Sequence, residues 1–201
     1  MLSSSLEKPR HVLSVSQFSP EFIDMLFQII DRNMVLIRKH GSVAGRYVGL
    51  HMDITFYEPS TRTRKSFEVA GFNYGMSVSV TENASQFSSA VKGESLEDTI
   101  RVIAGYDPIC IVLRHPERGA AKQAAMVSNV PIINGGDGDG EHPTQALLDL
   151  YTIHREIGRL DGLNIMAVGD NRYGRTIHSL IKLLSHYPGT SITCVRLMSS
   201  T

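Results

Sequence analysis

The sequence has no net charge and no long apolar run, and each of these absences excludes a class of protein. Its 201 residues carry 20 Lys plus Arg and 20 Asp plus Glu. A general binder of nucleic acid or of membrane surfaces needs a net basic field, which this composition lacks. No stretch approaches transmembrane length, and residues 1–10 contain no apolar core of a secretory signal. The sequence predicts a cytoplasmic protein with neither nucleic acid nor membrane as a partner.

Cysteine is also scarce. Cys110 and Cys194 are the only two, and each lies inside an apolar run. A disulfide framework or a zinc site needs more thiols at closer spacing. We therefore expect both to be small buried side chains in a reducing compartment.

The hydrophobic content is 42%, which is typical of a globular protein. Its periodicity changes repeatedly between helical and strand-like spacing. Helical patterns cover 20–40, 60–75, 95–105, 117–127, 143–157 and 174–186, and strand patterns cover 48–56, 76–81, 109–113, 131–133, 163–168 and 191–195. This alternation predicts an α/β fold with a parallel sheet flanked by helices.

A polar link bracketed by Gly158 and Gly162 follows the helix at 143–157. We expect a domain boundary there, with one domain at 1–157 and the start of a second at 158–201. The second part holds one β-α-β unit of about 40 residues, which is marginal for independent folding.

The segment that joins the first strand to its helix has an unusual charge pattern. Arg62, Arg64 and Lys65 lie in the first helical turn, where cations oppose the helix dipole. An anion at this helix terminus explains them, since backbone N–H groups, hydroxyls and Arg62 can converge on a phosphate. The alternative is a solvated basic face with Ser60 as the N-cap.

Polar groups also follow the other strands. These are the Ser-rich loop with Ser88 and Lys92, Arg114, the glycine-rich loop before His142, and Arg175. Each alone has an ordinary structural explanation, such as an ion pair or a helix cap. A neutral imidazole at a helix N-terminus, however, is a good hydrogen-bond donor to a carbonyl.

All five polar segments follow predicted parallel strands, so we expect them at one edge of the sheet, where α/β folds bind ligands. The sequence predicts a site for a small anionic, phosphorylated substrate. A P-loop is the rival, because residues 169–176 match G-x-x-x-x-G-K-[ST] with Arg175 in place of Lys. The broad guanidinium of Arg is not equivalent to the compact ammonium of Lys, so the match is imperfect.

The motifs resemble the transcarbamoylase family, and its aspartate branch in particular. Phe56 to Arg64, with the sequence FYEPSTRTR, resembles the carbamoyl-phosphate signature of that family. Residues 88–94 resemble the loop that a neighbouring subunit inserts into the site. Residues 142–150, HPTQALLDL, are close to the aspartate pattern, whereas the ornithine branch typically has Cys at the position of Thr144.

The resemblance implies transfer of a carbamoyl group from carbamoyl phosphate to L-aspartate, an early step of pyrimidine synthesis, without metal or cofactor. It implies that the substrates meet a set of polar side chains with distinct roles. Phosphate would be bound by Ser60, Thr61, Arg62, Thr63 and Arg114, the carbonyl oxygen by Thr63, Arg114 and His142, the carbamoyl NH₂ by Gln145, and an aspartate carboxylate by Arg175 and Lys92, with Ser88 and Lys92 coming from the next subunit of a homotrimer.

The resemblance also has a departure. The later elements of the family's aspartate-binding domain are missing, so we expect a Rossmann-like second domain represented by its first β-α-β unit. We expect a truncated product with little turnover alone. The alternatives are a non-catalytic carbamoyl-phosphate-binding or regulatory module and an ornithine-type enzyme. A regulatory subunit, or fusion to pathway enzymes, is compatible with the family.

Overall fold

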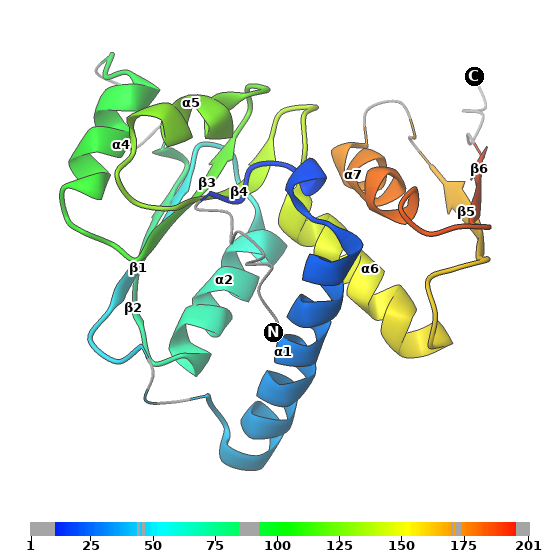
Figure 1. Cartoon of the computed structure of the whole chain (residues 1–201). Helices are drawn as coiled ribbons and strands as arrows, with labels where there is room; N and C mark the ends of the chain where they lie inside the picture. Colours follow the sequence, from blue (N-terminus) through cyan, green and yellow to red (C-terminus); the bar gives the residue numbers. More distant parts are fainter. Residues whose placement is uncertain are drawn as a thin grey trace, which may run out of the picture.

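The computed structural model describes residues 11–43, 45, 47–84, 93–169, 171 and 174–195. Strands and helices alternate along the chain (Figure 1). In chain order, the elements are the 3-10 helix η1 (Val15–Gln17), α1 (Pro20–His40), β1 (His51–Phe56), α2 (Thr61–Asn73), β2 (Ser77–Glu82), α4 (Leu96–Ala104), β3 (Cys110–His115), α5 (Ala120–Val127), β4 (Ile132–Asp137), α6 (Pro143–Ile157), β5 (Asn164–Val168), α7 (Arg175–Leu184) and β6 (Ser191–Val195).

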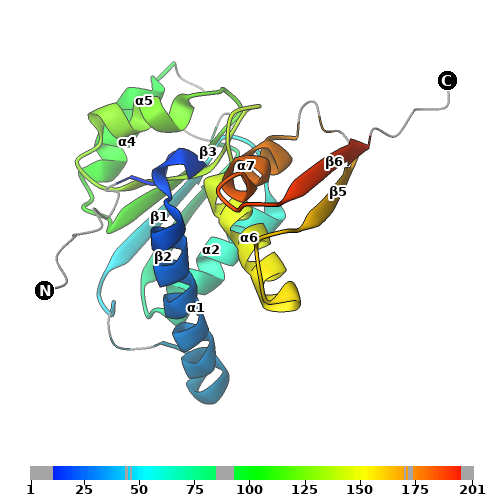
Figure 2. The same ribbon diagram turned by 45° about the vertical axis from the view of Figure 1, so that its right-hand side comes forward.

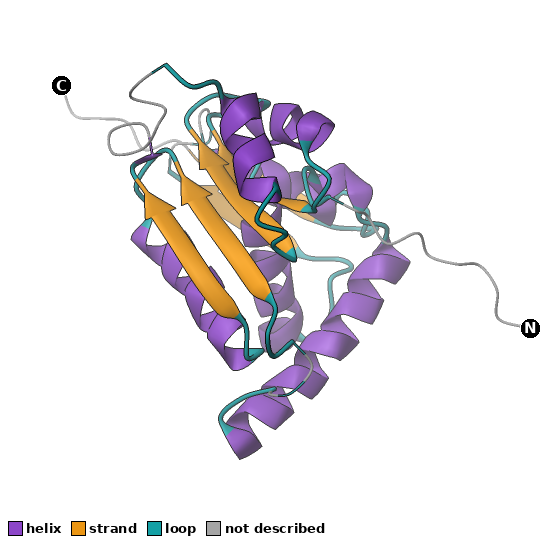
Figure 3. Ribbon diagram, turned by 90° about the vertical axis from the view of Figure 1, so that its left-hand side faces the viewer, coloured by secondary structure: helices purple, strands orange, loops and turns teal. Residues whose placement is uncertain are grey.

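The strands form two parallel sheets. The larger has the order β2-β1-β3-β4, and β5 pairs with β6 in a separate sheet. Helices cover both faces of the larger sheet (Figure 3). Phe67 of α2 packs against one face, and Ile100 of α4 and Ala124 of α5 belong to the cluster on the other. The predicted α/β fold with a helix-flanked parallel sheet is confirmed.

Strand β1 alternates apolar and polar residues, yet both of its faces are buried. Asp53 and Thr55 are 8% and 1% exposed. Hydrogen bonds satisfy the Asp53 carboxylate, since Thr55 Oγ1 and Ser79 Oγ each donate to it at 2.6 Å. His51 Nε2 lies 2.8 Å from the same Ser79 hydroxyl. The polar face of β1 is therefore an internal hydrogen-bond network between β1 and β2, and not a solvated surface.

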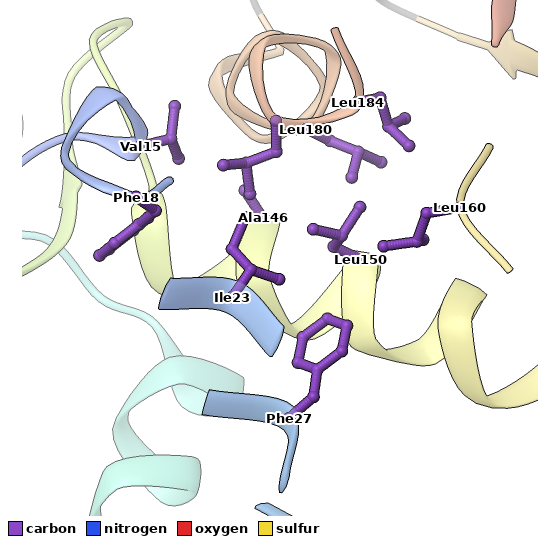
Figure 4. Packing of buried hydrophobic residues seen from close by; sticks show 10 residues of the cluster. Val15, Phe18, Ile23, Phe27, Ala146, Leu150, Leu160, Leu180 and Leu184 are labelled. Atoms are coloured by element: carbon purple, nitrogen blue, oxygen red, sulfur yellow. The ribbon is translucent and has the colours of Figure 1, made fainter. Parts of the chain in front are cut away.

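A core cluster joins the second sheet's helix to the first part of the chain. Figure 4 shows side chains from η1, α1, α6 and α7 pointing toward one another. Leu180 and Leu184 of α7 meet Ile23 of α1 and Leu150 of α6 in this cluster. Figure 2 shows α7 beside α6, with β5 and β6 beyond it. The α7 helix thus has its apolar face buried against elements that precede the predicted boundary.

Two predicted boundaries were wrong because of glycine conformations. The strand predicted at 48–56 begins only at His51, since Gly49 adopts a φ of 83° within a turn and leaves Val48 68% exposed. The helix predicted from Glu117 begins at Ala120, because Gly119 at its N-cap has a φ of 86°. Both φ values lie in the left-handed region, which interrupts regular strand or helix geometry.

Strand β4 continues to Asp137, four residues beyond the predicted end at Ile133. His115 pairs with Asp137 across an irregularity in the β3–β4 register. The glycines at its end allow close approach: a Cβ on Gly136 would lie 2.9 Å from Arg114 Nη1. The first part of the glycine-rich segment therefore belongs to β4, and the missing side chain of Gly136 leaves room for the Arg114 guanidinium.

An N-terminal segment pairs with the outer strand β4. Val12 N donates to Ile132 O, and Asn134 N donates to Val12 O, both at 2.8 Å. The His11 imidazole accepts a hydrogen bond from the N–H of Ile132. Residues 11–13 therefore extend the edge of the sheet by a short parallel bridge.

The cysteine prediction was only partly right. Cys110 is half-buried, and burial followed by the charge of Asp53 raises the pKa of its thiol to about 11. Cys194 is exposed, because it lies on β6 in a sheet of two strands. In the part of the chain that the structure describes, no helix is long and apolar enough to span a bilayer.

Candidate active site

His142 stands at the N-cap of α6 and is 4% exposed. Its Nε2 lies 3.4 Å from Thr63 Oγ1 of α2, and its Nδ1 lies 3.5 Å from Thr144 Oγ1. Its backbone N–H donates to Ser179 Oγ of α7 at 3.2 Å. The ring is thus held between α2 and α6, and its backbone is fixed by α7.

Burial, followed by the positive charges of Arg114 and Arg175, lowers the pKa of His142 to about 4. The imidazole is therefore neutral near pH 7. A neutral ring has one N–H donor, which suits polarisation of a carbonyl oxygen. The sequence predicted this protonation state from the helix dipole, but burial and the two arginines are the causes identified here.

A pocket of about 330 Å³ opens beside His142, between α2 and α6. Five polar side chains and two apolar ones accompany His142 in its wall. The full lining is Arg62, Thr63, Ser66, Phe67, His142, Thr144, Gln145 and Leu148. Three residues predicted from sequence, Arg62, Thr63 and Gln145, therefore share one pocket with the predicted His142.

At the N-terminus of α2, several polar side chains are exposed and make few hydrogen bonds within the described part of the protein. Ser60 has N-cap backbone geometry but makes no side-chain capping hydrogen bond. Thr61 is exposed, and Arg62 is exposed with no hydrogen-bond or ion-pair partner among the described residues. Arg64 and Lys65, in contrast, pair with Glu68 on the same helix. Of the three cations in the first turn, only Arg62 is left for a ligand.

Gln145 lies in the first turn of α6 and is half-buried. Its Nε2 donates to Asp149 Oδ1 at 2.8 Å, an i,i+4 contact along the helix. Burial raises the pKa of Asp149, against the lowering effect of that hydrogen bond.

Arg114 and Arg175 meet on a single carboxylate oxygen. Arg114 Nη2 lies 2.6 Å, and Arg175 Nη2 2.7 Å, from Glu58 Oε1. Arg114 also donates to Gly135 O, and Arg175 donates to Gly138 O. Burial and the charge of Arg175 lower the pKa of Arg114, against the effect of Glu58. Glu58 thus compensates two half-buried cations at the carboxyl end of the sheet.

Arg114 nevertheless keeps unused hydrogen-bonding capacity. Its Nε is buried and has no hydrogen-bond partner among the described residues. Its guanidinium is close enough to influence the protonation of His142. Arg114 does not line the pocket that holds Thr63 and His142, so its action together with them stays a prediction.

The arrangement of the predicted cations differs from one expectation. Arg175 is the first residue of α7, which follows β5 of the second sheet and not a strand of the first, yet its side chain reaches Glu58 and Gly138 O. The P-loop interpretation is not favoured by this contact, since the Arg175 side chain is occupied by protein oxygens. Ser88 and Lys92 lie outside the described residues.

Sequence reasoning assigned no role to Glu58, although it lies inside the quoted motif. The signal was present, since Glu58 is the one acidic residue in a segment with three cations. Its partners could not be deduced, because they are distant in sequence. Ser179 and Asp149 were missed for a similar reason: a single Ser or Asp on an amphipathic helix gives no signal of its own.

The domain model described as "Aspartate/ornithine carbamoyltransferase, carbamoyl-P binding domain" matches residues 10–155. The chain belongs to the aspartate/ornithine carbamoyltransferase family. The matched range contains Glu58, the N-terminus of α2, Arg114, His142 and Gln145. Members of this family therefore provide the frame for interpreting the pocket.

Several named relatives are similar over most of this chain. Aspartate carbamoyltransferase 1 (chloroplastic) of Pisum sativum is 53% identical over 176 residues, which are 88% of this chain and 45% of that protein. The aspartate carbamoyltransferase catalytic subunit of Thermoplasma acidophilum is 49% identical and covers 90% of this chain and 58% of its own length. The chain spans about half the length of the curated relatives it matches.

Solved structures give the same result for the fold. The catalytic subunit of M. jannaschii aspartate transcarbamoylase matches with a TM-score of 0.84 and 45% identity, over 95% of this chain and 61% of that one. Aspartate transcarbamoylase from Trypanosoma cruzi, in complex with carbamoyl phosphate and aspartate, matches with a TM-score of 0.86 and 35% identity, over 96% of this chain and 68% of that one.

Within the described residues, no group of three or more His, Cys, Asp or Glu could hold a metal ion.

Proposed function

We propose that this chain carries the carbamoyl-phosphate half-site of an aspartate carbamoyltransferase. The reaction transfers the carbamoyl group of carbamoyl phosphate to L-aspartate, giving N-carbamoyl-L-aspartate and phosphate, early in pyrimidine synthesis. One observation carries the proposal: Arg62, Thr63, His142 and Gln145 share one pocket within the region that matches the carbamoyl-P binding domain.

The phosphate end of the substrate is assigned to the N-terminus of α2. The backbone N–H groups there are joined by the hydroxyls of Ser60, Thr61 and Thr63 and by the Arg62 guanidinium, which has no partner in the part of the chain that the structure describes. A helix N-terminus favours an anion through its dipole and its free N–H groups. Arg114 contributes a second guanidinium toward the carbonyl side.

The carbonyl oxygen is assigned to Thr63, Arg114 and His142. When the aspartate amine attacks, a C–N bond forms, negative charge develops on that oxygen, and the phosphate then leaves with the C–O electron pair. Donors fixed in advance stabilise this charge, and each is worth on the order of 10²–10³ in rate in other oxyanion sites. A neutral His142 donates without adding a proton to the substrate. Gln145 is assigned to the carbamoyl NH₂.

The aspartate half requires a change of partners. Arg175 is assigned to a carboxylate of aspartate, but in the structure it is bound to Glu58 and Gly138 O. A substrate carboxylate must therefore replace Glu58 as the anion beside Arg175. Ser88 and Lys92 are assigned to the same site from a neighbouring subunit of a homotrimer, which makes assembly a condition of activity.

The remaining assignments concern the whole protein. We place the domain boundary after residue 157, which the family match at 10–155 supports. The aspartate substrate is supported by Thr144, where the ornithine branch typically has Cys, and by relatives named for aspartate. A cytoplasmic location stays a prediction, since several plant relatives are named chloroplastic. A regulatory subunit, or a fusion to pathway enzymes, is compatible with the relatives that are named catalytic subunits.

Binding to the 201-residue chain tests the half-site directly. Isothermal titration calorimetry with phosphonoacetamide, a stable analogue of carbamoyl phosphate, is expected to show saturable binding at millimolar concentrations or below. Absence of binding at these concentrations would overturn the half-site. Nucleotide binding that survives Arg62→Ala and fails with Arg175→Ala would instead support the P-loop interpretation.

Assembly needs a separate experiment. Mixing Lys92→Ala chains with Arg62→Ala chains of a catalytically competent assembly is expected to restore part of the carbamoyl-aspartate formation. Shared sites predict this because one site in the mixed trimer is free of both substitutions. No recovery on mixing would contradict the shared site.

A further inference from the structure

We propose that Asp149 is a positioning residue that fixes the side-chain amide of Gln145 with its carbonyl oxygen available to the carbamoyl NH₂. The proposal rests on the proposed function and extends it to a residue that does not line the pocket.

The geometry of α6 provides the first step. Gln145 lines the pocket beside His142, whereas Asp149 lies one helical turn further along and is absent from the lining. The two side chains meet at i,i+4 spacing, with Gln145 Nε2 and Asp149 Oδ1 2.8 Å apart. Asp149 thus acts on the pocket only through Gln145.

The hydrogen bond between Gln145 and Asp149 determines which end of the Gln145 amide is available to a ligand. A carboxylate can only accept hydrogen bonds, so it binds the NH₂ side of a glutamine amide and not its oxygen. One N–H of Gln145 is used by Asp149, and its Oε1 has no hydrogen-bond partner among the described residues. The oxygen, with both lone pairs, is the acceptor left for a ligand.

This orientation matters because an unrestrained amide can present either end. Glutamine oxygen and nitrogen have nearly the same shape, and the terminal torsion of the side chain is soft. The carbamoyl NH₂ is a donor, and it needs an acceptor opposite it. An amide turned the other way would present N–H to N–H and lose the hydrogen bond.

A purely structural role makes a different prediction. A Gln–Asp pair at i,i+4 stabilises a helix by about 0.2–0.5 kcal/mol, regardless of any ligand. Such a role would change the melting temperature but would not change how the protein distinguishes a ligand with an amide from one without.

The test compares two phosphonates by calorimetry on the full 201-residue chain. Phosphonoacetamide carries the amide NH₂, and methylphosphonate lacks it. Asp149→Leu is expected to weaken phosphonoacetamide binding about tenfold, the loss of one hydrogen bond of roughly 1.4 kcal/mol, and to leave methylphosphonate within about twofold.

Asp149→Asn is the conservative variant, because its amide oxygen can still accept from Gln145. Phosphonoacetamide affinity is expected to stay within about threefold of the parent chain. Glu156→Gln is the matched control, since it removes one charge from an exposed position of the same helix. It should alter neither affinity.

The outcomes separate this proposal from the proposed function. If the parent chain binds neither phosphonate, the phosphate site itself is wrong. If it binds both but Asp149→Leu weakens them equally, or weakens neither, the positioning role is overturned while the phosphate site stands. Thermal melts of each variant show whether the chain remains folded during the comparison.

Discussion

The pocket beside α2 and the arginine pair beside Glu58 both concern anions, but they handle charge differently. In the pocket, Arg62 is exposed and has no partner among the described residues. At the arginine pair, the side chains of Arg114 and Arg175 are 13% and 15% exposed and share one oxygen of Glu58. The pocket can accept a phosphate without breaking a protein contact, whereas the arginine pair must exchange one anion for another.

His142 links the two regions. Its ring faces the pocket through Thr63, while the charges of Arg114 and Arg175 help to keep it neutral. A change in the arginine pair therefore alters the donor in the pocket without touching the ligand. Local charge, and not the net charge of zero, therefore determines where this chain can hold an anion.

The largest expected effect is the pH dependence of stability. The pKa of His142 falls from 6.5 to about 4 on folding, so between these values the unfolded chain takes up a proton that the folded chain does not. The free energy of unfolding therefore decreases as the pH falls from about 6.5 to about 4, by up to roughly 3 kcal/mol from this group. Urea unfolding at several pH values measures it.

The variant His142→Gln isolates this contribution from other groups, including His115, whose pKa burial also lowers. For this variant, the slope of the unfolding free energy against pH is expected to be smaller over the same range. The difference corresponds to at most one bound proton. His186→Gln, at an exposed position, is the control and should keep the parent slope. Equal slopes in all three proteins would show that His142 is not the buried neutral group described here.

The next effect is on ligand affinity. Arg62→Ala is expected to weaken phosphonoacetamide binding about tenfold to a hundredfold, because a charged hydrogen bond contributes roughly 1.5–3 kcal/mol. Stability should change little, since Arg62 is exposed. Lys65→Ala removes a cation from the same turn that pairs with Glu68, and calorimetry should find its affinity within about threefold of the parent. Equal losses would mean a diffuse basic surface.

A smaller effect is expected at the arginine pair. Glu58→Gln leaves Arg114 and Arg175 facing one another without their shared anion, and should lower the free energy of unfolding by about 1–2 kcal/mol after allowance for partial exposure. Glu82→Gln is the control, because Glu82 pairs with Arg64, which also has Glu68 as a partner. Urea unfolding that ranks the two variants equally would argue against a special role for Glu58.

The smallest effect is expected for replacement of Ser60, and it tests whether the hydroxyl caps the helix or binds the ligand. An N-cap serine that bonds its helix costs about 1 kcal/mol on replacement by alanine, but Ser60 makes no such bond. Ser60→Ala is expected to change stability by less than about 0.5 kcal/mol while weakening phosphonoacetamide binding about threefold. Thermal melts and calorimetry together decide whether its hydroxyl serves the helix or the ligand.

Much of the fold could be predicted from periodicity. The order of the helices and strands followed from local patterns of apolar residues. The boundaries at Gly49 and Gly119 did not, because a glycine's φ is decided by the path of the chain around it. The separate β-α-β unit after residue 157 was expected, but the strand order β2-β1-β3-β4 was not, since strand pairing depends on contacts distant in sequence.

For the candidate site, motif position predicted the grouping of Arg62, Thr63, His142 and Gln145. Partners were harder to predict. Glu58 joins two arginines that lie 56 and 117 positions away along the sequence, and nothing local to any of the three indicates the others. Sequence patterns thus identify which residues carry chemistry, whereas charge compensation requires the folded arrangement.

The short parallel bridge at residues 11–13 has a consequence for self-association. An outer strand normally presents unpaired N–H and C=O groups that can capture a strand of another molecule. Here Val12 occupies those groups on the apolar stretch of β4, with hydrogen bonds to Ile132 and Asn134. The N-terminal segment therefore covers part of the β4 edge that could otherwise pair with a strand of another molecule.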